Sequence, residues 1–191
     1  YKLSLLGATP TFLEAMLASV QHPRDLTTLR YAFVGAEKCP DSLHDRMAHY
    51  CPHGSLCEGY GITECSPVIS VNIPGQTRRG SIGIPLPSVE CAVLIEDEAS
   101  MHPAPLNTTG MLLVRGPSIF EGYLASANNP FVEYDGKRWY RTGDLVQIDE
   151  EKALYFKGRL SRFVKIAGEM ISLPQIETVL QTALQVHAPA D

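Results

Sequence analysis

The sequence predicts an α/β-plus-β fold. It comprises the end of a parallel α/β subdomain, then a small antiparallel β-barrel or sandwich, then the start of a C-terminal α+β subdomain. Three observations support this. Strand-like and helix-like runs alternate over residues 1–74, and short apolar runs punctuated by glycine and proline fill residues 75–157. A hairpin-like run followed by a helix-start pattern occupies residues 158–191. Alternating strands and helices favour a parallel sheet, whereas short, turn-rich strands are typical of barrels and sandwiches.

The first zone contains two strand–helix pairs. Residues 3–6 form an apolar run that predicts a buried strand, and Thr9-Pro10 predicts a helix start with its cap before the proline. The apolar residues at helical spacing that follow are Phe12, Leu13, Met16, Leu17 and Val20. Residues 30–34 predict a second strand, and Pro40 opens a second helix with Leu43 and Met47 on one face.

The second zone predicts four strands, at residues 90–95, 110–115, 138–148 and 153–156. In the third zone, the run 163–166 followed by Gly168 predicts a hairpin arm. Residues 172–175 match a capping box, flanked by Ile171 and Ile176 as a hydrophobic staple. The predicted helix continues with Val179, Leu180 and Leu184 on its apolar face.

Composition excludes several classes of protein. The 191 residues are 45% hydrophobic and 19% charged, which is ordinary for a globular chain, with 16 basic and 21 acidic residues and a net charge of −5. This charge balance gives no basic footprint for nucleic acid. No apolar run approaches the ~20 residues that span a bilayer, and the start does not resemble a signal peptide. The chain begins without Met inside an apolar run, so we expect it to be an internal piece of a longer protein.

Five cysteines without a CxxC pair predict reduced thiols in a cytosolic setting. His49, Cys51, His53 and Cys57 lie close together in the sequence. Their spacing fits no standard zinc signature, so the sequence predicts no metal there.

The segment 58–64 (Glu-Gly-Tyr-Gly-Ile-Thr-Glu) follows a strand-like run and could approach a ligand closely. Its glycines admit close backbone contact, Tyr60 offers a flat face, Thr63 a hydroxyl donor and Glu64 an oxygen ligand for Mg²⁺. The alternative is a tight turn with an exposed acid.

Two further segments carry polar chemistry. In residues 139–144, Asp144 could accept both hydroxyls of a ribose, or it could be an ordinary hydrogen-bonding turn residue beside Gly143. In residues 158–169, cations recur at Arg159, Arg162 and Lys165, which is also the pattern of a solvated strand edge.

In this order, the segments resemble core motifs of the adenylate-forming superfamily, which includes acyl- and aryl-CoA synthetases, luciferases and the adenylation domains of peptide synthetases. Residues 60–64, 140–144 and 158–168 resemble three of its motifs, and Gly35-Ala36-Glu37 after a strand resembles a fourth. The resemblance extends over essentially the whole chain.

The resemblance implies roles for individual residues. Tyr60 would stack on adenine, with Glu58 and Gly59 beside it and Gly35, Ala36 and Glu37 along the other edge. Thr63 would contact the α-phosphate, Glu64 would help hold Mg²⁺, and Gly61 would be one of the nucleotide-binding residues. Asp144 would bind the ribose of ATP or AMP, and Arg159 would reach the nucleotide from the domain junction. The predicted catalytic residues are thus Thr63, Glu64 and Arg159. Ser161 stands where the family has a hinge residue, normally Asp or Lys, and is a departure.

A closer resemblance is to the synthetase half of the bacterial 2-acylglycerophosphoethanolamine acyltransferase/acyl-[acyl-carrier-protein] synthetase family, carried by residues 58–70 and 162–173. It implies formation of acyl-AMP from ATP and a fatty acid, then transfer to the phosphopantetheine thiol of acyl-carrier protein, for lysophospholipid reacylation. The HxxxxD motif of the acyltransferase half has no match in this chain.

These inferences predict the partners and the location. The partners are a fatty or other carboxylic acid and acyl-carrier protein or CoA. The longer parent is expected at the cytoplasmic face of the bacterial inner membrane, while the fragment itself is expected to be soluble and cytoplasmic. The family's phosphate loop and adenylation lysine would lie outside these residues, so we expect the 191 residues alone to be inactive. Two alternatives are an ordinary acyl- or aryl-CoA synthetase and a non-catalytic nucleotide-binding module.

Overall fold

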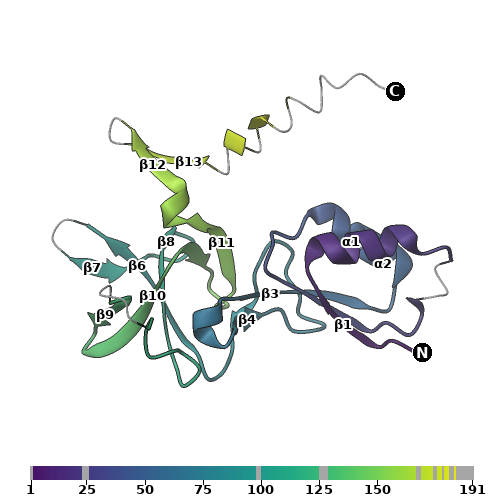
Figure 1. Ribbon diagram of the computed structural model, residues 1–191, viewed down its shortest axis with the longest axis horizontal. Coiled ribbons are helices and arrows are strands. Elements are labelled where there is room, and N and C mark those ends of the chain that lie inside the picture. The colour runs from purple at the N-terminus through teal and green to yellow at the C-terminus, as the bar shows by residue number, and fades with distance from the viewer. Residues whose placement is uncertain are drawn as a thin grey trace.

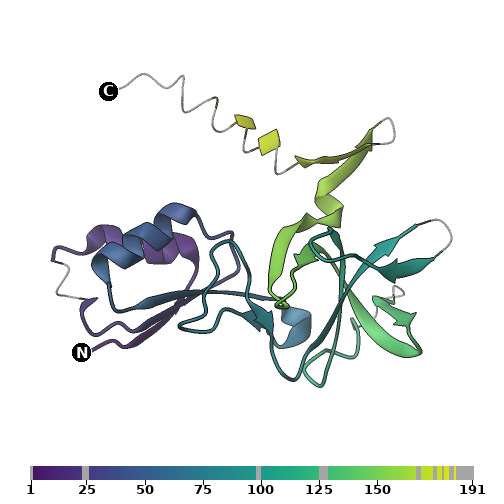
Figure 2. The same cartoon turned by 180° about the vertical axis from the view of Figure 1, so that it is seen from behind.

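A computed structural model gives the structure of the chain and describes residues 2–22, 26–97, 100–124, 129–166, 169–173, 176–177, 179–180 and 183. Figures 1 and 2 show an α/β body beside an antiparallel β body, joined through β3, with an arm that projects away from both. No helix in these described ranges is long and apolar enough to cross a membrane.

The α/β body has three parallel strands and two helices. In chain order these are β1 (Leu5–Ala8), α1 (Pro10–Ser19), β2 (Tyr31–Val34), α2 (Asp41–Tyr50) and β3 (Ser55–Gly61), with β2 pairing with both other strands. Both helices cover the same face of the sheet (Figures 1 and 2). Because the strands are parallel, the loops that follow them gather at one edge of the sheet.

The helix starts follow the predicted signals. The Thr9 hydroxyl caps α1 by accepting a hydrogen bond from the Phe12 amide at 3.2 Å, and Pro40 occupies the cap position of α2. Leu13 and Leu17 of α1 pack with Leu43 and Met47 of α2 in a single buried cluster. The predicted apolar faces are therefore confirmed, except that Phe12 is 60% exposed.

The first strand differs from its prediction. It begins two residues later than residue 3 and is not buried, since Leu5 is 55% exposed. Among the described strands β1 pairs only with β2, so it forms the edge of the sheet. An edge strand covered on one face leaves alternate side chains in solvent, whatever their hydrophobicity.

After β3 the sheet turns antiparallel through β4 (Val68–Val71) and β5 (Ile84–Pro85). Neither strand was predicted. Next to β5, the Ile82 amide donates to the Leu154 carbonyl, and the Leu154 amide donates to the Gly83 carbonyl. The first sheet is therefore hydrogen-bonded to the edge of the second.

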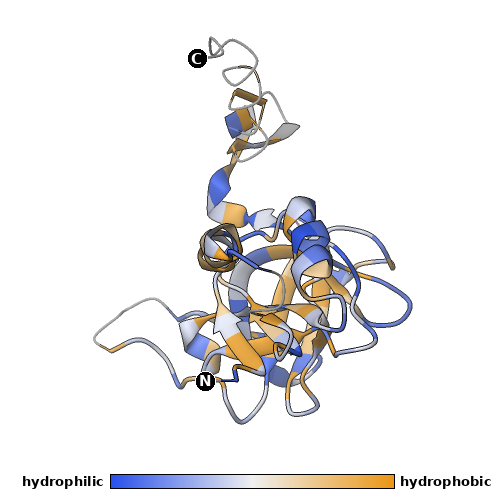
Figure 3. Ribbon diagram, turned by 90° about the vertical axis from the view of Figure 1, so that its right-hand side faces the viewer, coloured by the Kyte–Doolittle hydropathy of each residue, from blue (hydrophilic) through white to orange (hydrophobic). Residues whose placement is uncertain are grey.

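The second sheet is antiparallel and has the order β11-β10-β8-β6-β7, with β9 also pairing with β10. Its members are β6 (Glu90–Glu96), β7 (Met101–Pro103), β8 (Gly110–Arg115), β9 (Phe131–Tyr134), β10 (Lys137–Ile148) and β11 (Leu154–Arg159). The four predicted strands are confirmed within a few residues, and the short β7 and β9 were missed. The sheet curls into a nearly closed form (Figures 1 and 2) around a buried apolar cluster. Figure 3, coloured by hydropathy, shows apolar residues along the strands.

The interior of this curled sheet includes residues from the first zone. Cys65 and Ile69 are fully buried in one cluster with Leu112, Val146 and Leu154. The division into residues 1–74, 75–157 and 158–191 therefore stays a proposal, because packing and pairing continue across residue 74.

The arm begins at the 3₁₀ turn η3 (Leu160–Arg162) and continues as the hairpin of β12 (Phe163–Ile166) and β13 (Glu169–Ser172). The predicted hairpin is confirmed, and it projects from the second sheet (Figure 1). The predicted capping box ends at residues 174–175, outside the described residues.

Candidate active site

Two of the predicted site residues, Tyr60 and Asp144, join the two bodies at the end of β3. The Tyr60 hydroxyl of β3 donates a hydrogen bond to Oδ2 of Asp144 on β10, although 84 positions separate them in sequence. The Tyr60 ring also lies 6.1 Å from the Phe156 ring of β11, centroid to centroid. The expected convergence of Tyr60 and Asp144 is present in the structure.

A backbone irregularity buries Asp144. The register between β10 and β8 shifts between Arg141 and Leu145, and Gly143 adopts a φ of 76° that favours glycine. The Thr142 hydroxyl donates to the Leu112 carbonyl at 2.9 Å and accepts from the Asp144 amide at 3.0 Å. This bulge turns the Asp144 carboxylate inward, where it is 1% exposed.

The electrostatics keep Tyr60 as the donor and Asp144 as the acceptor. Burial, and then the nearby charge of Asp144, raises the pKa of Tyr60, so its hydroxyl stays protonated. Burial also raises the pKa of Asp144, against the opposing effects of the Tyr60 hydrogen bond and of Arg159. Nε of Arg159, at the end of β11, lies 3.3 Å from Oδ1 of Asp144.

The Gly35 loop passes directly beside this point. A Cβ on Gly35 would lie 2.9 Å from the carbonyl oxygen of Gly59, so a larger residue would separate the loop from β3. Ala36 follows with a left-handed φ of 69°. The sheet therefore brings the Gly35–Ala36 loop and the backbone before Tyr60 together at the carboxyl-terminal ends of its parallel strands.

The Glu37 side chain, in the loop between β2 and α2, contacts the N-terminus of α1. Its Oε2 accepts hydrogen bonds from the Thr11 hydroxyl at 2.6 Å and the Thr11 amide at 3.2 Å. A carboxylate at a helix N-terminus satisfies otherwise unpaired amides. These hydrogen bonds, the hydroxyl first, lower the pKa of Glu37.

The Glu37 contact predicts a pH dependence of stability. A carboxyl whose pKa is lower in the folded state stabilises the fold above its ordinary pKa of 4.5, and that contribution is lost as pH falls through the lower, folded value. We therefore measure the urea concentration at the midpoint of unfolding as a function of pH. In Glu37→Gln, we expect this midpoint to fall less steeply with decreasing pH below about pH 4.5 than in the unmodified protein. Glu133→Gln, at the exposed position of β9, serves as the control. The same change in both variants would contradict the assignment.

Thr63 and Glu64 lie in the short 3₁₀ turn η2 (Thr63–Cys65), which ends at Ser66 in a left-handed conformation. Thr63 is exposed and Glu64 is half-buried. Oε1 of Glu64 accepts a hydrogen bond from the Tyr123 hydroxyl at 2.6 Å, and the Glu64 carbonyl accepts from the Phe120 amide at 2.8 Å. The sequence motifs did not identify Tyr123, because a tyrosine 59 positions away carries no local sign of this contact.

The Thr63 hydroxyl and the Glu64 carboxylate are hard oxygen donors, as Mg²⁺ prefers. The charge of Glu64 is also a minor contribution to the raised pKa of Asp144, after burial. The oxygen donors at this turn fit a magnesium ion.

Glu58 lies apart from these groups. Its carboxylate is directed to α2, where Oε1 lies 3.0 Å from Nε2 of His44 and 3.4 Å from the Gly80 amide. Its backbone carbonyl accepts from the Asn72 amide at 2.8 Å. Whether Glu58 contacts adenine stays a prediction.

The hinge segment has contacts on both sides of Ser161, since Arg159 lies beside Asp144 and Arg162 pairs with Glu177. A Cβ on Gly158 would lie 2.9 Å from Cε2 of the Phe163 ring, so the start of the segment is closely packed. Ser161, in η3, is exposed, and so is Arg159 at 62% of its side chain.

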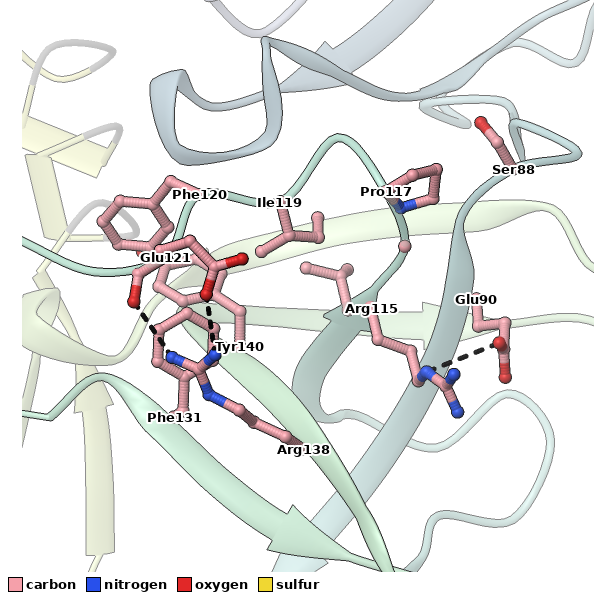
Figure 4. Close-up of a pocket in the computed structure, with 12 residues that line it drawn as sticks. Ser88, Glu90, Arg115, Pro117, Ile119, Phe120, Glu121, Phe131, Arg138 and Tyr140 are labelled. Carbon is pink, nitrogen blue, oxygen red and sulfur yellow. Dashed lines mark hydrogen bonds and ion pairs between the residues drawn. The ribbon is translucent and has the colours of Figure 1, made fainter.

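A pocket of about 320 Å³ opens beside this site, between β8, β10 and the loop 116–121 (Figure 4). Arg115 pairs with Glu90 and Arg138 with Glu121 at its rim, at 3.4 and 3.1 Å. Tyr140 in its lining lies 3.4 Å from Tyr123, hydroxyl to hydroxyl, which connects the pocket to Glu64.

The parallel strands, the curled antiparallel sheet and the motifs at their junction define the class of adenylate-forming enzymes. Residues 1–124 match the AMP-binding enzyme family, and the chain belongs to this family.

Curated relatives agree with this membership. The chain is 33% identical over 188 residues to a delta-poly-L-ornithine synthetase of Acinetobacter baumannii, covering 94% of this chain and 13% of that protein. It is 33% identical over 156 residues to an anthranilate–CoA ligase of Pseudomonas aeruginosa, covering 81% and 29%. The chain therefore spans less than a third of the length of either relative.

Solved structures show the same fold. An ATP-bound RpMatB-BxBclM chimera superposes with a TM-score of 0.80 at 27% identity, over 94% of this chain and 35% of that chain. O-succinylbenzoate coenzyme A synthetase of Bacillus subtilis, in complex with ATP and magnesium ion, gives 0.77 at 26% identity, over 96% and 37%.

Proposed function

We propose that this chain is the adenosine-binding and hinge part of an AMP-forming acid–thiol ligase. The observation that carries the proposal is the hydrogen bond from Tyr60 to Asp144. It brings the side chain expected to stack on adenine against the side chain expected to hold the ribose. Gly35 and Ala36 border the same point through Gly59.

The proposed reaction has two steps. A carboxylate oxygen of the acid attacks the α-phosphorus of ATP, the bond to the bridging oxygen breaks, and pyrophosphate leaves. The sulfur of a thiol then attacks the acyl carbonyl carbon, and AMP leaves as the acyl–oxygen bond breaks. Both steps depend on fixed groups that stabilise charge as it develops.

We assign each site residue a role in this reaction from its position in the structure. The exposed Thr63 hydroxyl donates to an α-phosphate oxygen, and Asp144 accepts from the ribose hydroxyls. Arg159, already 3.3 Å from Asp144, brings a positive charge to the same edge. Glu64, oriented by Tyr123, is the carboxylate that holds magnesium. Bound Mg²⁺ would neutralise charge on the phosphates.

Two thiol acceptors are candidates. The motif resemblance at residues 58–70 and 162–173 supports phosphopantetheine of acyl-carrier protein, with a fatty acid as substrate and lysophospholipid reacylation at the inner membrane as the context. Relatives that carry the names anthranilate–CoA ligase and 4-coumarate–CoA ligase support CoA instead. Either acceptor uses the same adenylate-forming site.

The test uses the full-length protein that carries this chain. We expect ATP–pyrophosphate exchange that depends on a fatty acid, and thioester formation that is faster with acyl-carrier protein than with CoA. Faster thioester formation with CoA would favour the second candidate. ATP binding without pyrophosphate exchange would overturn the ligase proposal in favour of a nucleotide-binding module.

The hinge makes a separate prediction. Enzymes resembling this chain rotate their C-terminal domain between the two half-reactions, and such pivots absorb large φ/ψ changes. Ser161→Pro fixes φ near −65° at an exposed position, so it should stall one half-reaction and spare the other. Pyrophosphate exchange and thiol acylation are assayed separately on this variant and on Ser161→Ala. Equal loss of both in the proline variant, with the fold intact, would place the pivot elsewhere.

A further inference from the structure

Three side chains with metal-binding atoms meet beside the proposed adenosine site. They are Cys39, just before α2, His44, in α2, and Glu58, in β3. The thiol sulfur, an imidazole nitrogen and a carboxylate oxygen all lie within 4.8 Å of one another. All three residues are largely buried, with Cys39 at 9% and Glu58 at 8% exposure.

We propose that Cys39, His44 and Glu58 bind a thiophilic divalent cation, with Zn²⁺ as the ion that fits best. The donor set of one sulfur, one nitrogen and one oxygen matches the ligands that zinc takes, whereas a thiolate disfavours Mg²⁺ and Ca²⁺. This site is therefore distinct from the magnesium position at Glu64, which offers oxygen donors alone.

The geometry is close to what a tetrahedral ion needs. Two nitrogen or oxygen ligands at ~2.0–2.1 Å from zinc lie about 3.3 Å apart, and sulfur lies about 3.6 Å from each. Nε2 of His44 and Oε1 of Glu58 are already 3.0 Å apart. The Cys39 sulfur already lies within 4.8 Å of both atoms, and its hydrogen bond to the Pro40 carbonyl is a weak contact of 3.9 Å. Three protein ligands leave a fourth position for water.

The local charge also favours a cation. In the described part of the chain, the Glu58 carboxylate contacts His44 and the Gly80 amide and no lysine or arginine. The nearby arginines are paired with other acids, Arg46 with Glu14 at 3.3 Å and Arg79 with Asp45 at 2.7 Å. A bound divalent ion would take Cys39 as the thiolate, so that the negative charges of the thiolate and of Glu58 would both be compensated.

The ion would connect the start of α2 to β3 at the position two residues before Tyr60. It would therefore stabilise the sheet edge on which the adenosine site is built. The further Cys57, next to Glu58, points to the opposite face of β3 because side chains alternate along a strand, so it cannot join the set.

The test is a metal titration of the full chain after removal of bound ions, with Co²⁺ as the spectroscopic probe. We expect one equivalent of Co²⁺ to give an intense sulfur-to-cobalt charge-transfer band that Zn²⁺ displaces and that excess Mg²⁺ leaves unchanged. Absence of the charge-transfer band, or of stoichiometric Zn²⁺ binding, would overturn the proposal. These readouts require no nucleotide, so they are independent of the proposed ligase activity.

Matched variants locate the ion. Cys39→Ala should abolish the sulfur-to-cobalt band. It should also weaken Zn²⁺ binding by more than ~10–100-fold, which is the loss in affinity typical when only a group that orients a metal ligand is removed. Cys51→Ala removes a thiol buried in the same core cluster and should leave both measurements unchanged. Glu58→Gln, which keeps the side-chain shape, should retain the band and lose affinity. Circular dichroism establishes that each variant is folded. Unchanged binding by folded Cys39→Ala, or equal loss in Cys51→Ala, would refute this site.

Discussion

Replacing Asp144 by asparagine should weaken AMP binding by the full-length protein by about 10- to 100-fold. Asp144 is 1% exposed and accepts from the Tyr60 hydroxyl, with Arg159 on its other oxygen. A hydrogen bond to a charged group contributes ~1.5–3 kcal/mol, and each 1.4 kcal/mol is about tenfold in affinity. An amide keeps the shape but removes the charge that orders Tyr60 and accepts the ribose hydroxyls. Isothermal calorimetry with AMP measures the effect.

The chain contains a matched control for this substitution. Asp149 also accepts from a tyrosine hydroxyl and an arginine, Tyr155 at 3.1 Å and Arg78 at 2.9 Å, outside the proposed site. Asp149→Asn should therefore lower stability and leave AMP affinity unchanged. Tyr60→Phe keeps the stacking ring and loses the hydroxyl, so it should affect AMP affinity less than Tyr60→Ala. If Asp144→Asn bound AMP as tightly as the unmodified protein, Asp144 would not be a ribose ligand.

Gly61→Ala should lower the free energy of unfolding by about 3 kcal/mol or more, at the upper end of single substitutions. A Cβ at residue 61 would lie 2.1 Å from the Pro67 carbonyl oxygen and 2.9 Å from the Val68 Cα. These are backbone atoms, and the Pro67 carbonyl also accepts from the Ile62 amide at 2.9 Å, so the turn carrying Thr63 and Glu64 would have to open.

Urea unfolding of the same chain measures the loss, with Gly7→Ala as the control. Gly7 lies in β1, and a Cβ there meets nothing within 4 Å. Because alanine loses less backbone entropy than glycine on folding, Gly7→Ala should be neutral or slightly stabilising. Similar unfolding midpoints for the two variants would show that the turn after β3 tolerates a side chain.

The sequence determined the elements whose signals are local. The Thr9 cap, the helix start at Pro40, and the buried pair Leu43 and Met47 follow from periodicity and capping, which depend on neighbours within a turn or two. The long strands β8 and β10 were predicted for the same reason. The order of the motifs around Tyr60, Asp144 and Arg159 was also sufficient to identify the family, which the match of residues 1–124 bears out.

Only the tertiary structure decided how residues distant in sequence combine. Leu5 is exposed because the helices cover only one face of the sheet, and Phe12 because it lies off the buried side of α1 formed by Leu13 and Leu17, which hydrophobicity does not reveal. Tyr123 reaches Glu64 because a loop folds back over β10. The sequence drew attention to His49 and Cys51 as neighbours, yet the exposed His49 and the buried Cys51 point to different environments. The cluster that forms instead unites Cys39, His44 and Glu58 from a loop, a helix and a strand. Such contacts arise when packing closes long loops, and no local pattern in the sequence records them.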